Sequence, residues 1–203
     1  MMKTGKKILI LSAVLLSLAF AVFRLTSSHA REESLTPTLN DATRVVELKD
    51  IQGYKTWARV HPEALRLPAP LDMLCVAPTR QQSVETSRNP HRQKYFVVYV
   101  NEAGRQAMMS QLKPVFPAGS IIVKEKLLAK DDASPELLTV MTKREKGFNE
   151  ASGDWEYMVV NGERTKIESR GNLENCRSCH LLKSETDYVF RSYLPDEARQ
   201  KLQ

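Results

Sequence analysis

The chain has 203 residues, of which 42% are hydrophobic and 27% charged, a composition typical of one globular domain with extensions. The formal net charge is +6, but the first thirty residues hold four of the 30 basic residues and no acid. The remainder therefore carries 26 basic against 24 acidic residues. No basic stripe with interleaved aromatic residues occurs in the sequence, which argues against nucleic acid as a partner.

Residues 1–30 are typical of an export signal. Three lysines precede a mainly apolar run of 16 residues, Ile8–Phe23, and the small residues of the SSHA segment suit cleavage after Ala30. The alternative is an uncleaved anchor in the inner membrane, although a spanning helix needs about 20 residues. Both interpretations place the rest of the chain in the periplasm, because lysines before the apolar run set this orientation.

Residues 31–53 are polar and are expected to form a leader, followed by a single domain over residues 54–203. An irregular loop is expected at 67–92, which is rich in Pro, Ser, Thr and Arg. Strands are expected where β-branched and aromatic residues gather, at 94–101, 120–129, 137–145 and 155–161. Helices are expected at 102–112 with Asn101 as cap, at 173–182 and at 194–203. The pattern predicts a mainly β (α+β) fold, an antiparallel sheet with a few helices.

The predicted helix near the C-terminus contains NCRSCH, residues 175–180, a C-x-x-C-H motif. Zinc would need a second pair of ligands, which the sequence lacks, and a redox dithiol usually sits early, at a strand-to-helix junction. Haem attachment accounts for all three residues, because Cys176, Cys179 and His180 share one helix face. The two thiols would bond to the haem vinyl groups and His180 to the iron. The motif thus predicts one covalently attached haem c, which agrees with export.

The second axial position of the iron stays open. Methionine there makes an electron-transfer centre, whereas an empty position makes a gas-binding or catalytic centre. No methionine follows the motif in a loop supported by Pro and Gly, so core filling is the preferred role of the candidates, Met73, Met108, Met109, Met141 and Met158. Cys75 has no partner once haem takes the other two cysteines, and a buried small side chain is its preferred role.

Four segments, in this order and spacing, resemble the cytochrome P-460 family, which includes the cytochrome c′-beta proteins: FPAGSIIVKEKL, GDWEY, NCRSCH and DYVFRSYL. The similarity extends from about Tyr54 to Leu194. It implies a mostly β, commonly dimeric protein with one five-coordinate haem c. In hydroxylamine-oxidising members a lysine is also bonded to the haem edge, and the matching residue here is Lys124.

The residues alone do not decide the role of Lys124, since alternation places it with Ile122, Lys126 and Leu128 on a mixed face. Hydroxylamine oxidation also removes protons, which a nearby carboxylate would accept. The following strand segment, 137–142, contains no acid. The nearby alternatives, for which a solvated turn or edge is the preferred interpretation, are Glu125, Asp131, Asp132 and Glu136.

Three functions therefore stand. The chain is an exported haem protein that oxidises hydroxylamine or handles nitric oxide, a non-catalytic nitric oxide binder or sensor, or a periplasmic electron-transfer cytochrome. Its expected partners are a small nitrogenous ligand, a soluble redox cytochrome and a second copy of itself, with membrane contact only if the N-terminal segment is uncleaved. Arg177 and Arg191 are candidate partners of the haem propionates.

Overall fold

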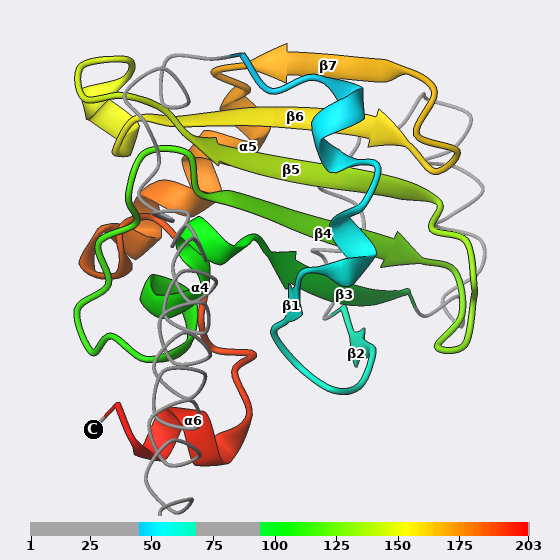
Figure 1. Ribbon diagram of the computed structural model, residues 1–203, viewed down its shortest axis with the longest axis horizontal. Coiled ribbons are helices and arrows are strands. Elements are labelled where there is room, and N and C mark those ends of the chain that lie inside the picture. The colour runs from blue at the N-terminus through cyan, green and yellow to red at the C-terminus, as the bar shows by residue number, and fades with distance from the viewer. Residues whose placement is uncertain (1–44, 68–93, 203) are drawn as a thin grey trace, which may run out of the picture. The chain divides into compact units, whose positions relative to one another are not determined.

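The computed structural model describes residues 45–67 and 94–202, and these form one antiparallel sheet of seven strands with short helices around it (Figure 1). The strand order is β1-β3-β4-β5-β6-β7, and β2 also pairs with β3. The strands are β1 Ala58–Arg59, β2 Leu65–Arg66, β3 Tyr95–Val100, β4 Ile121–Leu127, β5 Leu137–Lys143, β6 Trp155–Asn161 and β7 Ile167–Gly171. The predicted mainly β fold is confirmed.

The four central strands, β3 to β6, are those that the sequence predicts, and they pair in chain order as an antiparallel meander. Strand β7 was not expected, because Ile167–Gly171 is polar and lacks alternation of apolar side chains. The two-residue strands β1 and β2 are too short to leave a pattern. These three strands lie at the two edges of the sheet, where one-sided pairing tolerates polar sequence.

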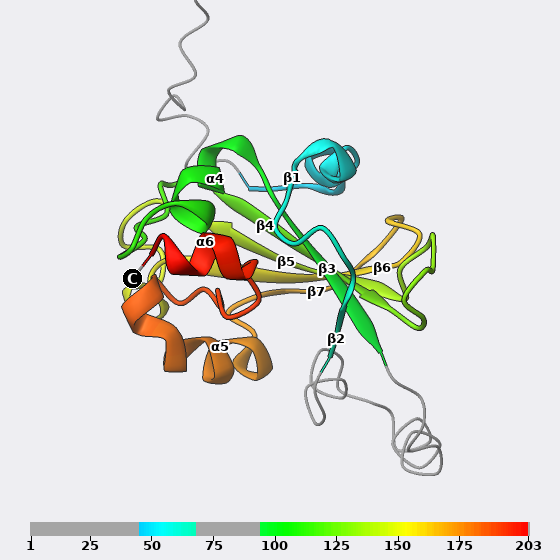
Figure 2. The ribbon, with the colours of Figure 1, turned by 90° about the horizontal axis from the view of Figure 1, so that it is seen from below.

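Both faces of the central sheet are buried, so β3 and β6 are almost continuously apolar rather than alternating. Figure 2 shows the 3-10 helices η1 (Leu48–Ile51) and η2 (Tyr54–Thr56) on one face and helix α5 (Glu174–His180) on the other. The face toward η1 and η2 carries a core that includes Val123, Leu138 and Val160. The face toward α5 carries a second core, which includes Val98, Ile122 and Tyr157.

Ordered structure begins before the boundary expected at Tyr54. Val46 is 8% exposed and Ile51 is fully buried, and both pack in the core beneath η1 and η2. The stretch 45–53 is therefore part of the packed body rather than a leader. The predicted export signal, the rest of the leader, Cys75, Met73 and most of the predicted irregular loop lie outside the described residues.

The remaining helices are α4 (Glu102–Met109), η3 (Glu150–Ser152), η4 (Leu181–Thr186) and α6 (Asp196–Gln200). The predicted cap of α4 is confirmed, because the Asn101 side chain accepts the Gly104 backbone N–H at 3.2 Å. Helix α5 runs directly into η4 after His180. Within the two described stretches, no helix has the length and apolar character needed to cross a bilayer.

Candidate functional site

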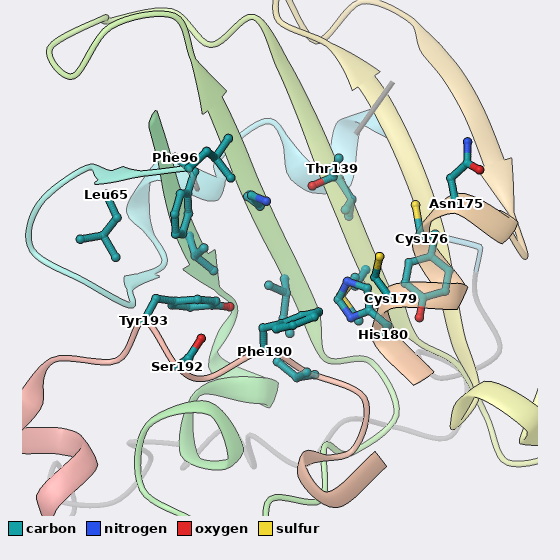
Figure 3. A pocket seen from close by; sticks show the side chains of 18 of the residues that line it. Leu65, Phe96, Thr139, Asn175, Cys176, Cys179, His180, Phe190, Ser192 and Tyr193 are labelled. Atoms are coloured by element: carbon teal, nitrogen blue, oxygen red, sulfur yellow. The ribbon is translucent and has the colours of Figure 1, made fainter. Parts of the chain in front are cut away.

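A cavity of about 460 Å³ lies between helix α5 and the sheet face opposite η1 and η2 (Figure 3). Its walls come from strands β2 to β6, from α5 and from the segment 189–193. Cys176, Cys179, His180 and Lys124 all line it. The structure therefore brings together the four residues that the sequence singles out, although Lys124 lies about fifty residues before the motif.

Helix α5 presents the motif to the cavity. Its predicted helical spacing is confirmed over Glu174–His180, so the two cysteines and the histidine share the face that lines the cavity. Leu173 and Cys176 pack against the hydrophobic core, which anchors this helix to the sheet. On the outer side, Arg177 donates two hydrogen bonds to Glu174, at 3.0 and 2.8 Å.

The imidazole of His180 is held by a backbone carbonyl. Its Nδ1 lies 2.6 Å from the carbonyl oxygen of Tyr188. A carbonyl can only accept, so Nδ1 carries the proton and Nε2 presents its lone pair. Burial lowers the pKa of His180, opposed by the Tyr188 hydrogen bond and assisted by the positive charge of Lys124. The ring is thereby kept in the neutral form that binds a metal.

Two aromatic rings flank this imidazole. The Tyr157 ring centre lies 5.4 Å from that of His180, and the Phe190 ring centre lies 5.0 Å away in an edge-on arrangement. Tyr157 is 2% exposed and its hydroxyl has no hydrogen-bond partner among the described residues, while burial raises its pKa. The local sequence pattern favours a core role for Tyr157, and an aromatic residue beside a haem would leave the same pattern. Its alternation with Trp155 was visible, but its neighbour on α5 was not.

Strand alternation directs Lys124 to the cavity and its neighbour Glu125 to the other face of the sheet. In the sheet register Lys124 lies between Val98 and Thr139, which also line the cavity. Its Nζ is 5.1 Å from the centre of the Phe96 ring, a cation–π distance. Lysines on strands are usually exposed to solvent, whereas Lys124 lines the cavity.

The expectation of a solvated edge is wrong for Glu125. Glu125 is 4% exposed, and its carboxylate accepts a hydrogen bond from the Tyr54 hydroxyl and pairs with Lys55 at 3.4 Å. Asp131, Asp132 and Glu136 are exposed, as expected, and Glu136 accepts hydrogen bonds from Lys94. None of the acids proposed as a base lines the cavity, and its described lining contains no Asp or Glu at all.

The cavity wall that faces the motif is apolar and aromatic. Figure 3 shows Leu65, Phe96 and Tyr193 on the side away from His180. The rings of Phe96 and Tyr193 meet edge-on, with centres 5.6 Å apart. The sequence predicts that Phe96 lies on a strand but not that it faces the cavity, because β3 is apolar on both faces.

Only two of the candidate methionines, Met141 and Met158, line the cavity, whereas Met108 and Met109 pack in the core and Met73 lies outside the described residues. Met141 pairs in register with Tyr157, whose ring contacts His180. Met141 thus sits on the His180 side of the cavity. Met158 belongs to the core on the opposite sheet face.

The two arginines considered for the haem propionates are engaged elsewhere. Arg177 pairs with Glu174, and Arg191 donates to the Met108 carbonyl at 2.9 Å. Neither lines the cavity. Arg66, Asn175 and Ser192 do, and all three are exposed, so polar groups line the cavity where it meets solvent.

The donor set fits a covalently held haem. Two thiols and an imidazole with an available Nε2 lone pair face one cavity, whose other walls are mainly apolar. Its volume lies within the range of about 300–1,000 Å³ found for cofactor sites. The geometry therefore agrees with the motif.

Comparison with known proteins adds one match. A family model described as Cytochrome P460 matches residues 76–191, more than half of the chain. The matched region includes Lys124, both motif cysteines and His180. No curated protein matches the chain.

Proposed function

The chain belongs to the cytochrome P460 family, a family of cytochromes with covalently attached haem c, and on this basis we propose that it is an exported mono-haem protein that binds nitric oxide. In this proposal Cys176 and Cys179 would hold the haem through thioether bonds, and His180 would bind its iron through Nε2. When bound, the haem would supply a redox-active iron that can bind a small ligand. Everything else that the ligand meets comes from the chain.

The residues opposite His180 are suited to a small, uncharged ligand. Phe96, Tyr193 and Leu65 line the side of the cavity away from His180, and a mainly apolar wall there would favour a small ligand of low polarity. Nitric oxide binds without giving up or taking up a proton. A wall without ionisable carboxylates therefore suffices for it.

The single observation that carries this choice is the absence of Asp and Glu from the described lining of the cavity. Oxidation of hydroxylamine releases protons, and a positioned general base typically contributes about 10²- to 10⁴-fold in rate. The buried carboxylate nearest in sequence to Lys124 is Glu125, which lies on the other face of the sheet. Binding of nitric oxide therefore ranks ahead of hydroxylamine turnover.

Hydroxylamine oxidation remains the second candidate, because it is typical of the family and because Lys124 lines the cavity. A bond from Lys124 to the haem edge would place the chain with the hydroxylamine-oxidising members. The electron-carrier alternative has less support, since Met141 lies on the same side of the cavity as His180.

Export, location and partners also belong to the proposal. The three lysines and the apolar run Ile8–Phe23 support export to the periplasm, with or without retention of the segment as an anchor. Export agrees with haem c attachment outside the cytoplasm. A soluble cytochrome is the proposed redox partner, and a second copy of the chain the proposed oligomeric partner.

The test uses holoprotein made with an intact haem-maturation system. We expect a high-spin spectrum, tight binding of nitric oxide to the ferrous form, and slow or no hydroxylamine turnover. Rapid turnover together with a strongly red-shifted ferrous Soret band would favour the second candidate instead. A low-spin spectrum with a methionine-to-iron band would leave only the electron carrier, and colourless protein would refute haem binding altogether.

A further inference from the structure

The carbonyl that accepts the His180 Nδ1–H belongs to an unusual backbone segment. Tyr188 has φ +65° and the preceding Asp187 has φ +53°, so two successive residues other than glycine are left-handed. Asp tolerates this region, but a bulky aromatic residue seldom adopts it. Such conformations persist where neighbouring groups hold them in place. The contacts of Asp187 and Tyr188 therefore decide where this carbonyl points.

Asp187 is held by three groups. Lys143, the last residue of β5, lies 2.7 and 2.8 Å from its two carboxylate oxygens. The Phe116 backbone N–H donates to the same carboxylate at 2.8 Å, and the indole N–H of Trp155 donates to the Asp187 carbonyl at 2.8 Å. The side chains of Lys143 and Asp187 are 13% and 14% exposed, so this pair is more shielded than a surface ion pair.

Tyr188 is held from the other side. Its backbone N–H donates to the Lys183 carbonyl at 2.7 Å. Its ring lies so close to Gly153 that a Cβ added there would come within 2.3 Å of the ring. The turn is thus held between the paired ends of β5 and β6, where Lys143 lies opposite Trp155, and helix η4.

From this arrangement we propose that Asp187 and Lys143 are positioning residues for His180. They hold Tyr188 left-handed, and its carbonyl then fixes the orientation of the imidazole and accepts its Nδ1–H at short range. A hydrogen bond from Nδ1–H to an acceptor fixes the ring and makes Nε2 a stronger donor to a metal. The ion pair therefore sets how strongly His180 binds iron, without contact to the haem.

This inference rests on the proposed role of His180 as the iron ligand. Removing the positive partner of Asp187 should loosen the turn and weaken the Nδ1–H bond to Tyr188. Nε2 then becomes a weaker donor. The iron–histidine stretching frequency of the ferrous protein should shift down, and the haem reduction potential should shift up, because ferric iron loses more stabilisation than ferrous iron.

The variants are Lys143→Met and Lys143→Arg, measured as ferrous holoprotein by resonance Raman and by redox titration. Lys143→Met should lower the stretching frequency and raise the potential, and Lys143→Arg should restore both toward wild type. The matched control is Lys94→Met. Lys94 has a similar exposure, 12%, and an equally short ion pair with Glu136, 2.7 Å, so the control removes the same charge without touching Asp187.

An unchanged stretching band in Lys143→Met, or an equal shift in Lys94→Met, would overturn the proposal while leaving His180 as ligand. Absence of an iron–histidine band from a wild-type protein whose ferrous spectrum is five-coordinate and high-spin would instead refute the role of His180 itself. If Lys143→Met fails to accumulate with haem, Trp155→Phe makes the same test. It removes the indole N–H donor to Asp187, together with part of a buried ring, and leaves Lys143 in place. It should also lower the band, and no shift there overturns the proposal.

Discussion

The ammonium of Lys124 lies 5.1 Å from the centre of the Phe96 ring, inside the cavity that the haem-binding motif also lines. Two strands bring them together, β3 with Phe96 and β4 with Lys124. The contact links the residue proposed to bond to the haem edge with one proposed to close the ligand side of the cavity. Each can be tested separately.

Lys124→Ala tests the bond to the haem edge. If wild-type protein has the red-shifted ferrous Soret band that such a bond produces, the variant should lose the shift and keep its haem, because Cys176 and Cys179 still hold it. Optical spectra of the reduced proteins make the comparison. Lys126→Ala is the control, since Lys126 lies on the same strand, is 4% exposed and does not line the cavity. If the red-shifted Soret band persists in Lys124→Ala, Lys124 is not the residue that bonds to the haem edge.

Phe96→Ala tests the wall opposite His180. The smaller side chain should speed nitric oxide association several-fold, as followed by stopped-flow spectroscopy of the ferrous protein. Loss of the buried ring should also destabilise the fold by about 3–5 kcal/mol. Tyr99→Ala separates the two effects, because Tyr99 lies on the same strand with the same 8% exposure and packs in the core of the other face. Equal association rates in the two variants would show that Phe96 does not limit ligand entry.

Cys179→Ala tests the covalent attachment. We expect a holoprotein with one thioether bond, whose pyridine haemochrome band shifts to the red because one vinyl group remains unreacted. The measurement is the haemochrome spectrum of the denatured variant beside that of wild type. Ser178→Ala, a neighbouring change on an exposed residue of the same helix, should leave the band in place.

Glu156 makes stability depend on pH. Burial opposes its charged form, but hydrogen bonds from Arg170 and Arg144 outweigh burial and hold its pKa below the usual value. Because the folded-state pKa is depressed, the stabilisation is present above the unfolded carboxyl pKa, about 4.3, and is lost as the pH falls through the folded value. Acid should therefore weaken this contribution.

Glu156→Gln should lower the free energy of unfolding by about 1–3 kcal/mol at neutral pH, since three charge-assisted hydrogen bonds from two arginines are weakened. Urea unfolding at a series of pH values should show the difference from wild type shrinking below about pH 4. Glu168→Gln is the control, because its ion pair with Lys166 is exposed, and it should change stability by under about 0.5 kcal/mol. A difference that stays constant into acid would contradict this account.

Gly153→Ala should disturb the segment that holds His180. Both Gly153 (φ +64°) and Gly147 (φ +93°) are left-handed, but only a Cβ at Gly153 would meet the Tyr188 ring, and Gly147 faces open space. Gly147→Ala should cost about 1–2 kcal/mol from backbone strain. Gly153→Ala should cost about 1–3 kcal/mol more from the clash, as measured by thermal unfolding. Equal losses would show that the Tyr188 ring moves aside freely.

The local sequence pattern was sufficient to predict the central strands and the helix face that carries the motif. Helical spacing alone predicted that Cys176, Cys179 and His180 share one face, and the content of β-branched and aromatic residues located the four central strands. Both depend on residues only a few positions apart, so they could be read without knowing the fold. The same holds for the Asn101 cap of α4.

The position of Lys124 in the cavity, and of Glu125 behind the sheet, could not be predicted in this way. Which face of a strand meets α5 depends on pairing between distant segments, and a sheet buried on both faces hides its register behind continuous apolar sequence. The Tyr188 carbonyl, Lys143 and Trp155 meet only because β5, β6 and the segment after α5 converge. Short-range periodicity determined that the three motif residues share one helix face, and long-range packing decided which other side chains line the cavity with them.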